Sequence, residues 1–189
     1  MKVEINDKKD AILKAALELI SEQGFHGTPM SQIAHKADVS IGIIYHYFTG
    51  KDDLINELYL TIKLHLSEYS LRNYSSGMPV RKAFKHLLKS FILYFVDHPA
   101  ELSFIEQCEN SPLITEATFR ECMHFKNTIE DLYRSAMEQD LIKNLRFEIL
   151  GQMINSSMIA LAKLYLAGTV KMEDTLDAGL DAIWDMAKK

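Results

Sequence analysis

Apolar residues recur with the period of an α-helix along almost the whole chain, and no segment shows the alternation of a β-strand. Residues 7–23 are the clearest case, because their apolar positions follow the spacing i, i+3, i+4, i+7 and i+8 and so form one helix face. These positions are Ile12, Ala15, Ala16, Leu19 and Ile20. Asp7 is a candidate cap for this helix and Gly24 a stop signal. The pattern predicts an all-α protein.

Two short helices are predicted next, joined by a tight turn. Thr28 followed by Pro29 is a start signal, because a hydroxyl at the N-cap precedes a proline at the first helical position, where no N–H is needed. Ser40 is expected to cap the second short helix. The expected ranges are 29–36 and 41–47 for the helices and 37–39 for the turn.

A long helix is predicted from Lys51, where Asp52 and Asp53 occupy the first turn and favour the helix dipole. The polar segment 73–79 contains Ser, Gly and Pro, and is the best candidate for a domain boundary. Further helices are expected near 79–97, 99–109, 115–139, 146–167 and 172–187. The chain is therefore expected to form a three-helix domain over 1–50, a connecting helix over 51–72 and a larger helical bundle over 73–189.

Residues 28–48 meet the packing requirements of a helix-turn-helix. Ala34 is small enough to let the two short helices approach closely, and Val39 supplies the inward apolar residue of the turn. Ile44 and Phe48, spaced i and i+4, are expected to form the buried face of the second helix. A helix packed in this way presents its opposite face outward, ready for a groove of DNA.

The outward face carries aromatic and small residues. Tyr45 and Tyr47 offer hydroxyls suited to phosphate oxygens. Gly42 lowers helix stability by about 1 kcal/mol relative to Ala. A need for close approach to a DNA backbone would explain a glycine at this position. The alternative makes Gly42 a packing glycine and both tyrosines part of a helical core.

Residues 12–54 resemble the N-terminal domain of the tetracycline-repressor (TetR) family of transcriptional regulators. The shared elements are Ala15-Ala16, Leu19-Ile20, Gly24-Phe25, Thr28, Ile33-Ala34, Ala37, Val39-Ser40, Gly42, Tyr45, Tyr47-Phe48, Lys51 and Leu54. The resemblance implies a homodimer that binds double-stranded operator DNA, with the second short helix of each subunit in the major groove. It also implies a ligand-responsive regulator, most often a repressor, whose residues 73–189 bind a small effector and form the dimer.

The predicted DNA-binding domain, residues 1–50, is called the reading head, or head, below. Carried over by position, the resemblance gives a role to several of its residues and to Lys51, which follows it. Thr28 and Tyr47 would hold phosphates, and Lys51 would clamp the DNA backbone. The residues nearest the groove floor would be Ser40, Ile41, Gly42 and Tyr45, with His46 at the edge. Position 41 is often lysine in similar sequences, whereas isoleucine can contact a thymine methyl group but cannot read guanine. We expect weak electrostatic affinity and a preference for A·T-rich steps.

Charge and cysteine content limit the remaining possibilities. The formal net charge is −5, and residues 1–55 contain six lysines and eight acidic residues, so no basic field attracts nucleic acid. The two cysteines, Cys108 and Cys122, are expected to be free thiols of a cytoplasmic protein. No export signal, membrane span, metal-ligand set, nucleophile motif or phosphate loop is apparent, so neither a metal nor a cofactor is expected.

The second domain contains a group of aromatic, methionine and amide residues on helical faces. Such residues suit an adaptable site for an apolar or amphipathic ligand, although each could equally fill a bundle core. The candidate pocket residues are Phe91, Tyr94, Phe95, Phe104, Gln107, Phe119, Met123, Asn127 and Met158.

The last two predicted helices are candidates for a two-fold dimer interface, since 146–167 is apolar almost all round. The candidate interface residues are Met153, Leu161, Leu176, Leu180, Ile183 and Trp184. The alternative is that these residues form a core within one chain. A rival interpretation of the whole protein is a helical-bundle carrier or enzyme for hydrophobic molecules without DNA binding.

Overall fold

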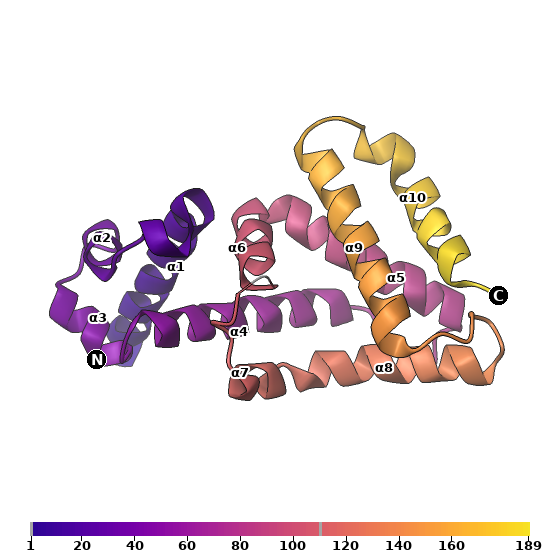
Figure 1. The fold of residues 1–189 in the computed structure, drawn as a ribbon, viewed down its shortest axis with the longest axis horizontal. Coiled ribbons are helices and arrows are strands. Elements are labelled where there is room, and N and C mark those ends of the chain that lie inside the picture. Colours follow the sequence, from indigo (N-terminus) through magenta and orange to yellow (C-terminus); the bar gives the residue numbers. More distant parts are fainter. Residues whose placement is uncertain (1, 110) are drawn as a thin grey trace. The chain divides into compact units, whose positions relative to one another are not determined.

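The computed structural model describes residues 2–109 and 111–189, and within them the fold is entirely helical apart from one isolated bridge (Figure 1). The helices are α1 (Lys2–Gly27), α2 (Met30–Lys36), α3 (Ile41–Tyr47), α4 (Lys51–Leu71), α5 (Val80–Asp97), α6 (Pro99–Glu109), α7 (Glu116–Glu121), α8 (Met123–Glu138), α9 (Phe147–Leu166) and α10 (Met172–Ala187). The predicted all-α class is therefore confirmed.

Two local details differ from the sequence-based expectation, and one agrees with it. Helix α1 already begins at Lys2, so Asp7 lies inside it and does not cap it. Gly24 does interrupt α1, with a φ of 75°, a conformation open to glycine. The single helix expected over 115–139 is divided into α7 and α8 around Cys122.

The structure forms two compact units whose limits cut across the expected domains. The N-terminal unit consists of the chain up to Lys63 together with Ala100–Glu121, and the C-terminal unit consists of Leu64–Pro99 together with Cys122–Lys189. Helices α6 and α7, expected in the second domain, thus belong to the N-terminal unit, and α4 contributes to both units.

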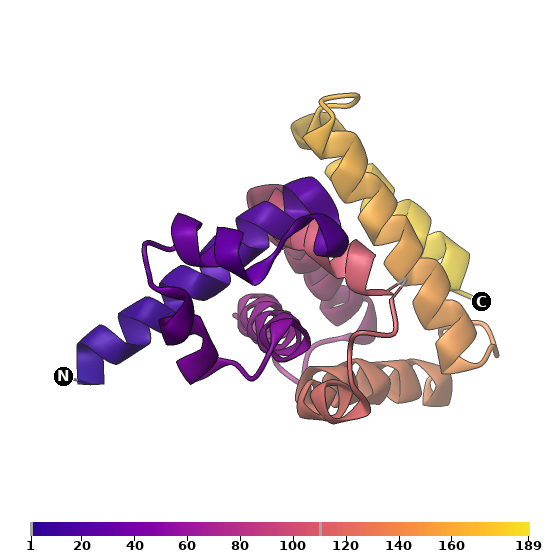
Figure 2. The same ribbon diagram turned by 60° about the vertical axis from the view of Figure 1, so that its left-hand side comes forward.

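In the N-terminal unit, α1 packs against α2 and α3 (Figure 1, Figure 2). Its fully buried side chains include Ile12, Ile20, Ile33, Ile44, Leu54 and Phe104. Because the apolar faces of α1, α2 and α3 meet in this core, the outward face of α3 has a fixed orientation within the unit.

The turn between α2 and α3 is a Schellman motif. The Val39 N–H donates to the Ala34 carbonyl at 3.0 Å, and the Asp38 N–H donates to the His35 carbonyl at 3.2 Å. Asp38 adopts a φ of 52° to close the turn, a left-handed conformation that strains a residue with a Cβ.

In the C-terminal unit, α5 packs against α8, α9 and α10. The rings of Phe84 and Trp184 meet edge to face at 5.0 Å between centroids. Helices α9 and α10 form an antiparallel pair (Figure 1). They approach so closely that a Cβ on Gly179 would lie 2.9 Å from Leu161 Cδ1. The last residues are fixed by an antiparallel bridge between Ile142 and Lys188.

This packing revises the candidate dimer residues. Leu180, Ile183 and Trp184 are buried within one chain, because α10 turns them toward α5 and α9, so they have almost no surface left for a partner. Leu161 and Leu176 are half-buried. Of the six candidates only Met153 is exposed, at 44%.

Helix α9 is nevertheless apolar on the outside. It is long and apolar enough to cross a membrane, with a mean hydropathy of 1.2 over 18 residues, but only 17% of that window is buried inside the chain. Ile149, Met153, Leu164 and Leu166 are among the exposed large apolar side chains of the described residues. These side chains give α9 an exposed apolar face.

Replacing Asp38 by glycine is expected to raise the free energy of unfolding by about 0.5–1 kcal/mol, because glycine adopts the left-handed conformation without strain. Urea unfolding followed by circular dichroism measures the change. Asp10→Gly, at an exposed helical position, is the control and should lower stability. A lower midpoint for Asp38→Gly would contradict the role given to this φ angle.

Burial raises the pKa of the Cys108 thiol to about 12, with a smaller opposing effect from Lys63. At pH 8 only about one thiol in ten thousand is then ionised, and the thiolate is the reactive form. In a Cys122→Ser variant, which leaves one thiol, we expect no reaction with Ellman's reagent in the native state and full reaction after unfolding. Rapid native labelling would show that this part of the core opens.

Candidate nucleic-acid interface

The exposed face of α3 is formed by the residues that the helical period places opposite the core. Ile44 and Phe48 are 0% and 2% exposed and anchor the helix. Ile41 and Tyr45 lie on the other side, at 42% and 56% exposure, although both have large side chains that burial would favour. Exposed apolar and aromatic groups on one short helix are typical of an interaction surface.

Small and polar residues complete this face. Gly42 and His46 are exposed. A Cβ on Gly42 would meet nothing closer than Ser40 Oγ at 3.9 Å, an ordinary contact, so no internal packing requires glycine at this position. The alternative of a packing glycine is therefore wrong for the described residues. The groove-facing surface predicted from sequence thus has Ser40, Ile41, Gly42, Tyr45 and His46 exposed together.

Ser40 and Tyr47 differ in detail from their expected positions. Ser40 occupies the N-cap of α3 but its hydroxyl makes no capping hydrogen bond and stays exposed. Tyr47 is half-buried; its ring lies 5.3 Å from that of His46 in an edge-to-face contact and 6.4 Å from that of Phe48 in a tilted one, both measured between centroids. Ring packing against both neighbours fixes the direction of the Tyr47 side chain, whereas Tyr45 remains the more exposed aromatic residue.

Thr28 does not fit the phosphate contact that the resemblance implied. The residue is 0% exposed, and its Oγ1 donates to the Gly24 carbonyl at 2.9 Å. Pro29, and not Thr28, occupies the N-cap of α2. The Thr28 hydroxyl is thus bonded inside the protein, to the backbone at the break in α1.

Lys51 is likewise tied to the protein. Its Nζ donates to the carbonyl of Phe25, in the turn that follows the break in α1. Burial lowers the pKa of the Lys51 ammonium, while the charge of Asp52 opposes this shift. The predicted phosphate clamp is therefore also a link between the start of α4 and the end of α1.

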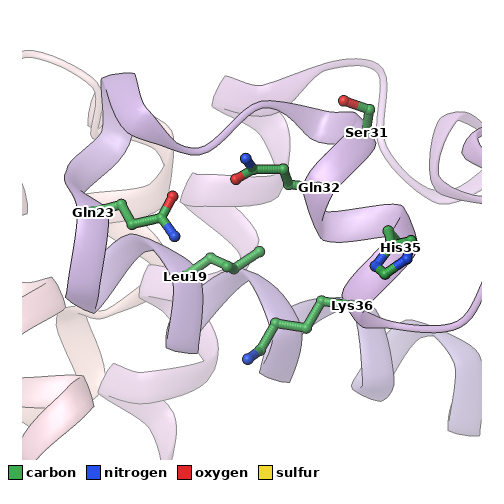
Figure 3. A pocket seen from close by; sticks show the side chains of 6 residues that line it. All are labelled: Leu19, Gln23, Ser31, Gln32, His35 and Lys36. Atoms are coloured by element: carbon green, nitrogen blue, oxygen red, sulfur yellow. The ribbon is translucent and has the colours of Figure 1, made fainter.

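Sequence reasoning missed a polar surface on α2. Ser31, Gln32, His35 and Lys36 of α2, with Leu19 and Gln23 of α1, line an open groove of about 600 Å³ (Figure 3). Five of these six side chains carry a hydrogen-bonding group suited to phosphate oxygens, although much of the lining surface is apolar. The signal was the outward position of residues 31, 32 and 35 on a helix whose buried residues are Ile33 and Ala34.

Three lysines of the head are engaged within the protein. Lys9 pairs with Glu57 at 2.6 Å and Lys36 with Glu18 at 3.0 Å. The hydrogen bond with Glu18 raises the pKa of Lys36. With Lys51 bound to a carbonyl, at least three of the six lysines in residues 1–55 have partners among the described side chains. The head is thus poorer in available positive charge than its composition indicates.

The candidate effector residues do not all fall in one unit. Phe104, Gln107 and Phe119 belong to the N-terminal unit. There Phe104 is fully buried against Phe25, Gln107 hydrogen-bonds to α1, and Phe119 is 51% exposed beside Tyr59. The side chain of Met123 lies outside the described residues, and Asn127 is exposed.

The remaining candidates lie in the C-terminal unit around one aromatic cluster, formed by Phe91, Tyr94 and Phe95 of α5 with Tyr69 of α4. Ring centroids are 4.8 Å apart for Phe91–Phe95, 5.3 Å for Tyr94–Phe95 and 5.5 Å for Tyr69–Tyr94. Met158, on α9 in the same unit, is half-buried.

Comparison with known proteins agrees with this architecture. A family model described as "Bacterial regulatory proteins, tetR family" matches residues 12–58, and one described as "Tetracyclin repressor-like, C-terminal domain" matches residues 59–189. The HTH-type transcriptional regulator HbdR from Aromatoleum sp. (strain CIB) is 45% identical over 65 residues, which are 34% of this chain and 27% of HbdR.

Two solved structures share the fold over nearly the whole chain. A TetR family transcription regulator from Marinobacter aquaeolei VT8 has a TM-score of 0.92 at 18% identity and covers 100% of both chains. FadR from Bacillus subtilis, in complex with stearoyl-CoA, has a TM-score of 0.71 at 15% identity and covers 92% of this chain and 96% of FadR. Since the two family models together span residues 12–189, the chain belongs to the TetR family of DNA-binding transcriptional regulators.

Proposed function

We propose that this chain is a cytoplasmic, homodimeric repressor that leaves its operator when a small apolar or amphipathic effector binds. The observation that carries the DNA-binding part is the exposed face of α3, where Ile41 and Tyr45 stand out from a helix anchored by Ile44 and Phe48. Tyr45 and Tyr47 would donate hydroxyls to phosphates, and Ile41 would contact thymine methyl groups. Thr28 and Lys51 would act indirectly, by holding the head in shape.

The low charge of the head sets the expected energetics. A binder that neutralises few phosphates releases few counterions, so its affinity should fall only shallowly with salt. Dimer geometry then matters more, because the two heads must reach half-sites about one helical turn apart at the same time.

The dimer is proposed to form along one stripe of α9. Ile149, Met153, Ser156, Ala160 and Leu164 follow the spacing i, i+4, i+7, i+11 and i+15, and all are exposed. Ser156 and Ala160 are small and lie at its centre, so two copies of α9 could approach closely across a two-fold axis. The apolar character of α9 outside its own chain supports this use.

The effector is proposed to bind within the C-terminal unit near the aromatic cluster, rather than at the residues of the N-terminal unit. Beside Tyr69, the Ser70 hydroxyl is buried without a hydrogen-bond partner in the described part of the chain, while its carbonyl lies 3.1 Å from His86 Nε2. A largely buried aromatic cluster next to an unsatisfied hydroxyl suits a ligand that is mostly apolar with a polar group. The stearoyl-CoA complex of FadR, which shares the fold, is in keeping with an amphipathic effector.

Ile41→Lys is expected to tighten operator binding several-fold and to steepen the salt dependence by about two units of slope, one for each added phosphate contact in a dimer. Fluorescence anisotropy on duplexes from the DNA flanking the gene, at several salt concentrations, measures both. Ala178→Lys adds the same charge at an exposed site on α10 and should change neither. An unchanged slope for Ile41→Lys would place position 41 away from the DNA.

The same assay tests the rival interpretation of a carrier without DNA binding. Tyr45→Ala and Tyr47→Phe are expected to weaken operator binding by about tenfold or more each, since each removes phosphate-directed hydroxyls from both heads. Equal absence of binding by the wild-type protein and by both variants would favour the carrier.

Met153→Glu is expected to dissociate the dimer, because it places two like charges close together in an apolar interface. Sedimentation equilibrium should show a dimer for the wild-type protein and a dimerisation constant at least about a hundredfold weaker for the variant. Leu64→Glu, at another exposed apolar residue, is the matched control and should remain dimeric. A dimeric Met153→Glu variant would exclude the α9 stripe as the interface.

A further inference from the structure

Helix α4 carries a buried hydroxyl group without a hydrogen-bond partner. Ser70 is 0% exposed, and its Oγ is the one buried side-chain oxygen or nitrogen of the described residues that has no partner. Buried polar groups are normally hydrogen-bonded, because a hydroxyl that leaves water without gaining a new partner lowers the stability of the fold. A serine at this position therefore points to a role other than stability.

Helix α5 approaches Ser70 at two levels. Nε2 of His86 lies 3.1 Å from the Ser70 carbonyl oxygen, and the ring of Tyr94 meets that of the neighbouring Tyr69 at 5.5 Å between centroids. Since a carbonyl oxygen can only accept, Nε2 of His86 carries the hydrogen and donates it. This bond fixes residue 70 against α5 through its backbone and leaves its hydroxyl unused.

The stretch of α5 between His86 and Tyr94 is mostly apolar and largely buried. Leu87, Leu88 and Ile92 are 6%, 4% and 0% exposed. All of these residues, like Ser70, belong to the C-terminal unit. The unpartnered hydroxyl is thus set in apolar and aromatic surroundings.

The charges on α5 favour an uncharged ligand at this level. Lys85 pairs with Asp181 of α10 at 2.9 Å, and Lys89 is exposed. An ionised carboxylate taken out of water needs a cation or several hydrogen-bond donors. A ligand hydroxyl needs only one donor and one acceptor, and the hydroxyl of Ser70 can act as either.

We propose that Ser70 is the specificity-determining contact of the effector site, and that the effector carries an uncharged hydroxyl group on an apolar body. His86 is a positioning residue, which holds residue 70 through its carbonyl. Because Ser70 Oγ is closed to solvent, the ligand reaches it when a half-buried ring of the aromatic cluster, Tyr69 or Phe91, turns aside. The inference rests on the proposed function for the location of the site and adds the chemical class of the ligand.

The first test is the stability of the protein without ligand. Ser70→Ala removes the unpartnered hydroxyl, so the midpoint of thermal unfolding should rise by about 3 °C or more. Ser67→Ala, one turn earlier on α4 and also buried, gains the same helix propensity and is the matched control, with a rise at least about 2 °C smaller. A lower midpoint for Ser70→Ala, or a rise no larger than that of Ser67→Ala, would show that the hydroxyl has a partner, such as a bound water molecule. Either result would overturn the proposal.

The second test compares three probes of one ring system: 1-naphthol, 1-methylnaphthalene and 1-naphthoate. They carry a hydroxyl, a methyl and an ionised carboxyl group, and their binding to the full-length chain is measured by equilibrium dialysis at neutral pH. The wild-type protein and Ser67→Ala should bind 1-naphthol about tenfold or more tighter than either of the other probes. In Ser70→Ala the preference for 1-naphthol over 1-methylnaphthalene should fall to about twofold or less, because the hydrogen bond is lost while the apolar contacts remain.

Four outcomes of the dialysis would contradict the proposal. They are equal binding of 1-naphthol and 1-methylnaphthalene by the wild-type protein, the same preference in Ser70→Ala as in the wild type, tighter binding of 1-naphthoate, and no binding of any probe up to its solubility.

Selection of an operator from random duplexes separates this inference from the proposed function. If the wild-type protein selects no operator but discriminates 1-naphthol through Ser70, the proposed regulator fails and the hydroxyl site stands. If it selects an operator and shows no preference for the hydroxyl probe, the inference fails and the proposed function stands.

Discussion

The N-terminal unit depends on the point where α1 leaves the helical conformation at Gly24. The break frees carbonyl groups at the end of α1, and buried carbonyls must find donors. Thr28 and Lys51 supply them from the chain that leads into α2 and from the start of α4. Side chains from the start of the helix-turn-helix and from the start of α4 therefore bind the same turn of the backbone, at Gly24 and Phe25.

The same arrangement explains why the head has so little charge to offer DNA. Lysines that could face phosphates are used to hold the protein together: Lys9 and Lys36 pair with acidic residues, and Lys51 binds a carbonyl. What remains on the surface is hydroxyl, amide, imidazole and apolar groups on α2 and α3. Such groups recognise shape and methyl groups at short range but attract DNA weakly from a distance.

The helices could be predicted from sequence because their signals are local. Apolar periodicity and the break at Gly24 depend on neighbouring residues, and α3 was predicted with its observed bounds. The buried Ile44 and exposed Tyr45 follow from the same periodicity. The sequence could not assign Thr28, Lys51 or Gln107, because each acts on a carbonyl of another segment and the type of residue does not identify its partner.

Assignments in the second half were harder for a related reason. An apolar helical face fits a core, a ligand site or a dimer interface equally well, and only the packing of other helices decides between them. Trp184 and Met153 were indistinguishable in this respect, yet α5 covers the first and leaves the second exposed. The place of α6 in the N-terminal unit was also hidden, since it depends on contacts more than eighty residues apart in sequence.

In the proposed dimer, a weakly charged head and an apolar interface on α9 have complementary roles. When each head binds weakly, joining two heads raises the affinity through effective concentration, and that gain vanishes if their spacing no longer fits the half-sites. Control of spacing is then an efficient way to control binding, because a small shift removes a large part of the affinity. A strongly basic head would keep much of its affinity for DNA after such a shift, because its phosphate contacts do not depend on the exact position of the half-sites. In the proposed dimer, the scarcity of free lysines on α2 and α3 therefore makes operator binding more sensitive to the distance between the two heads.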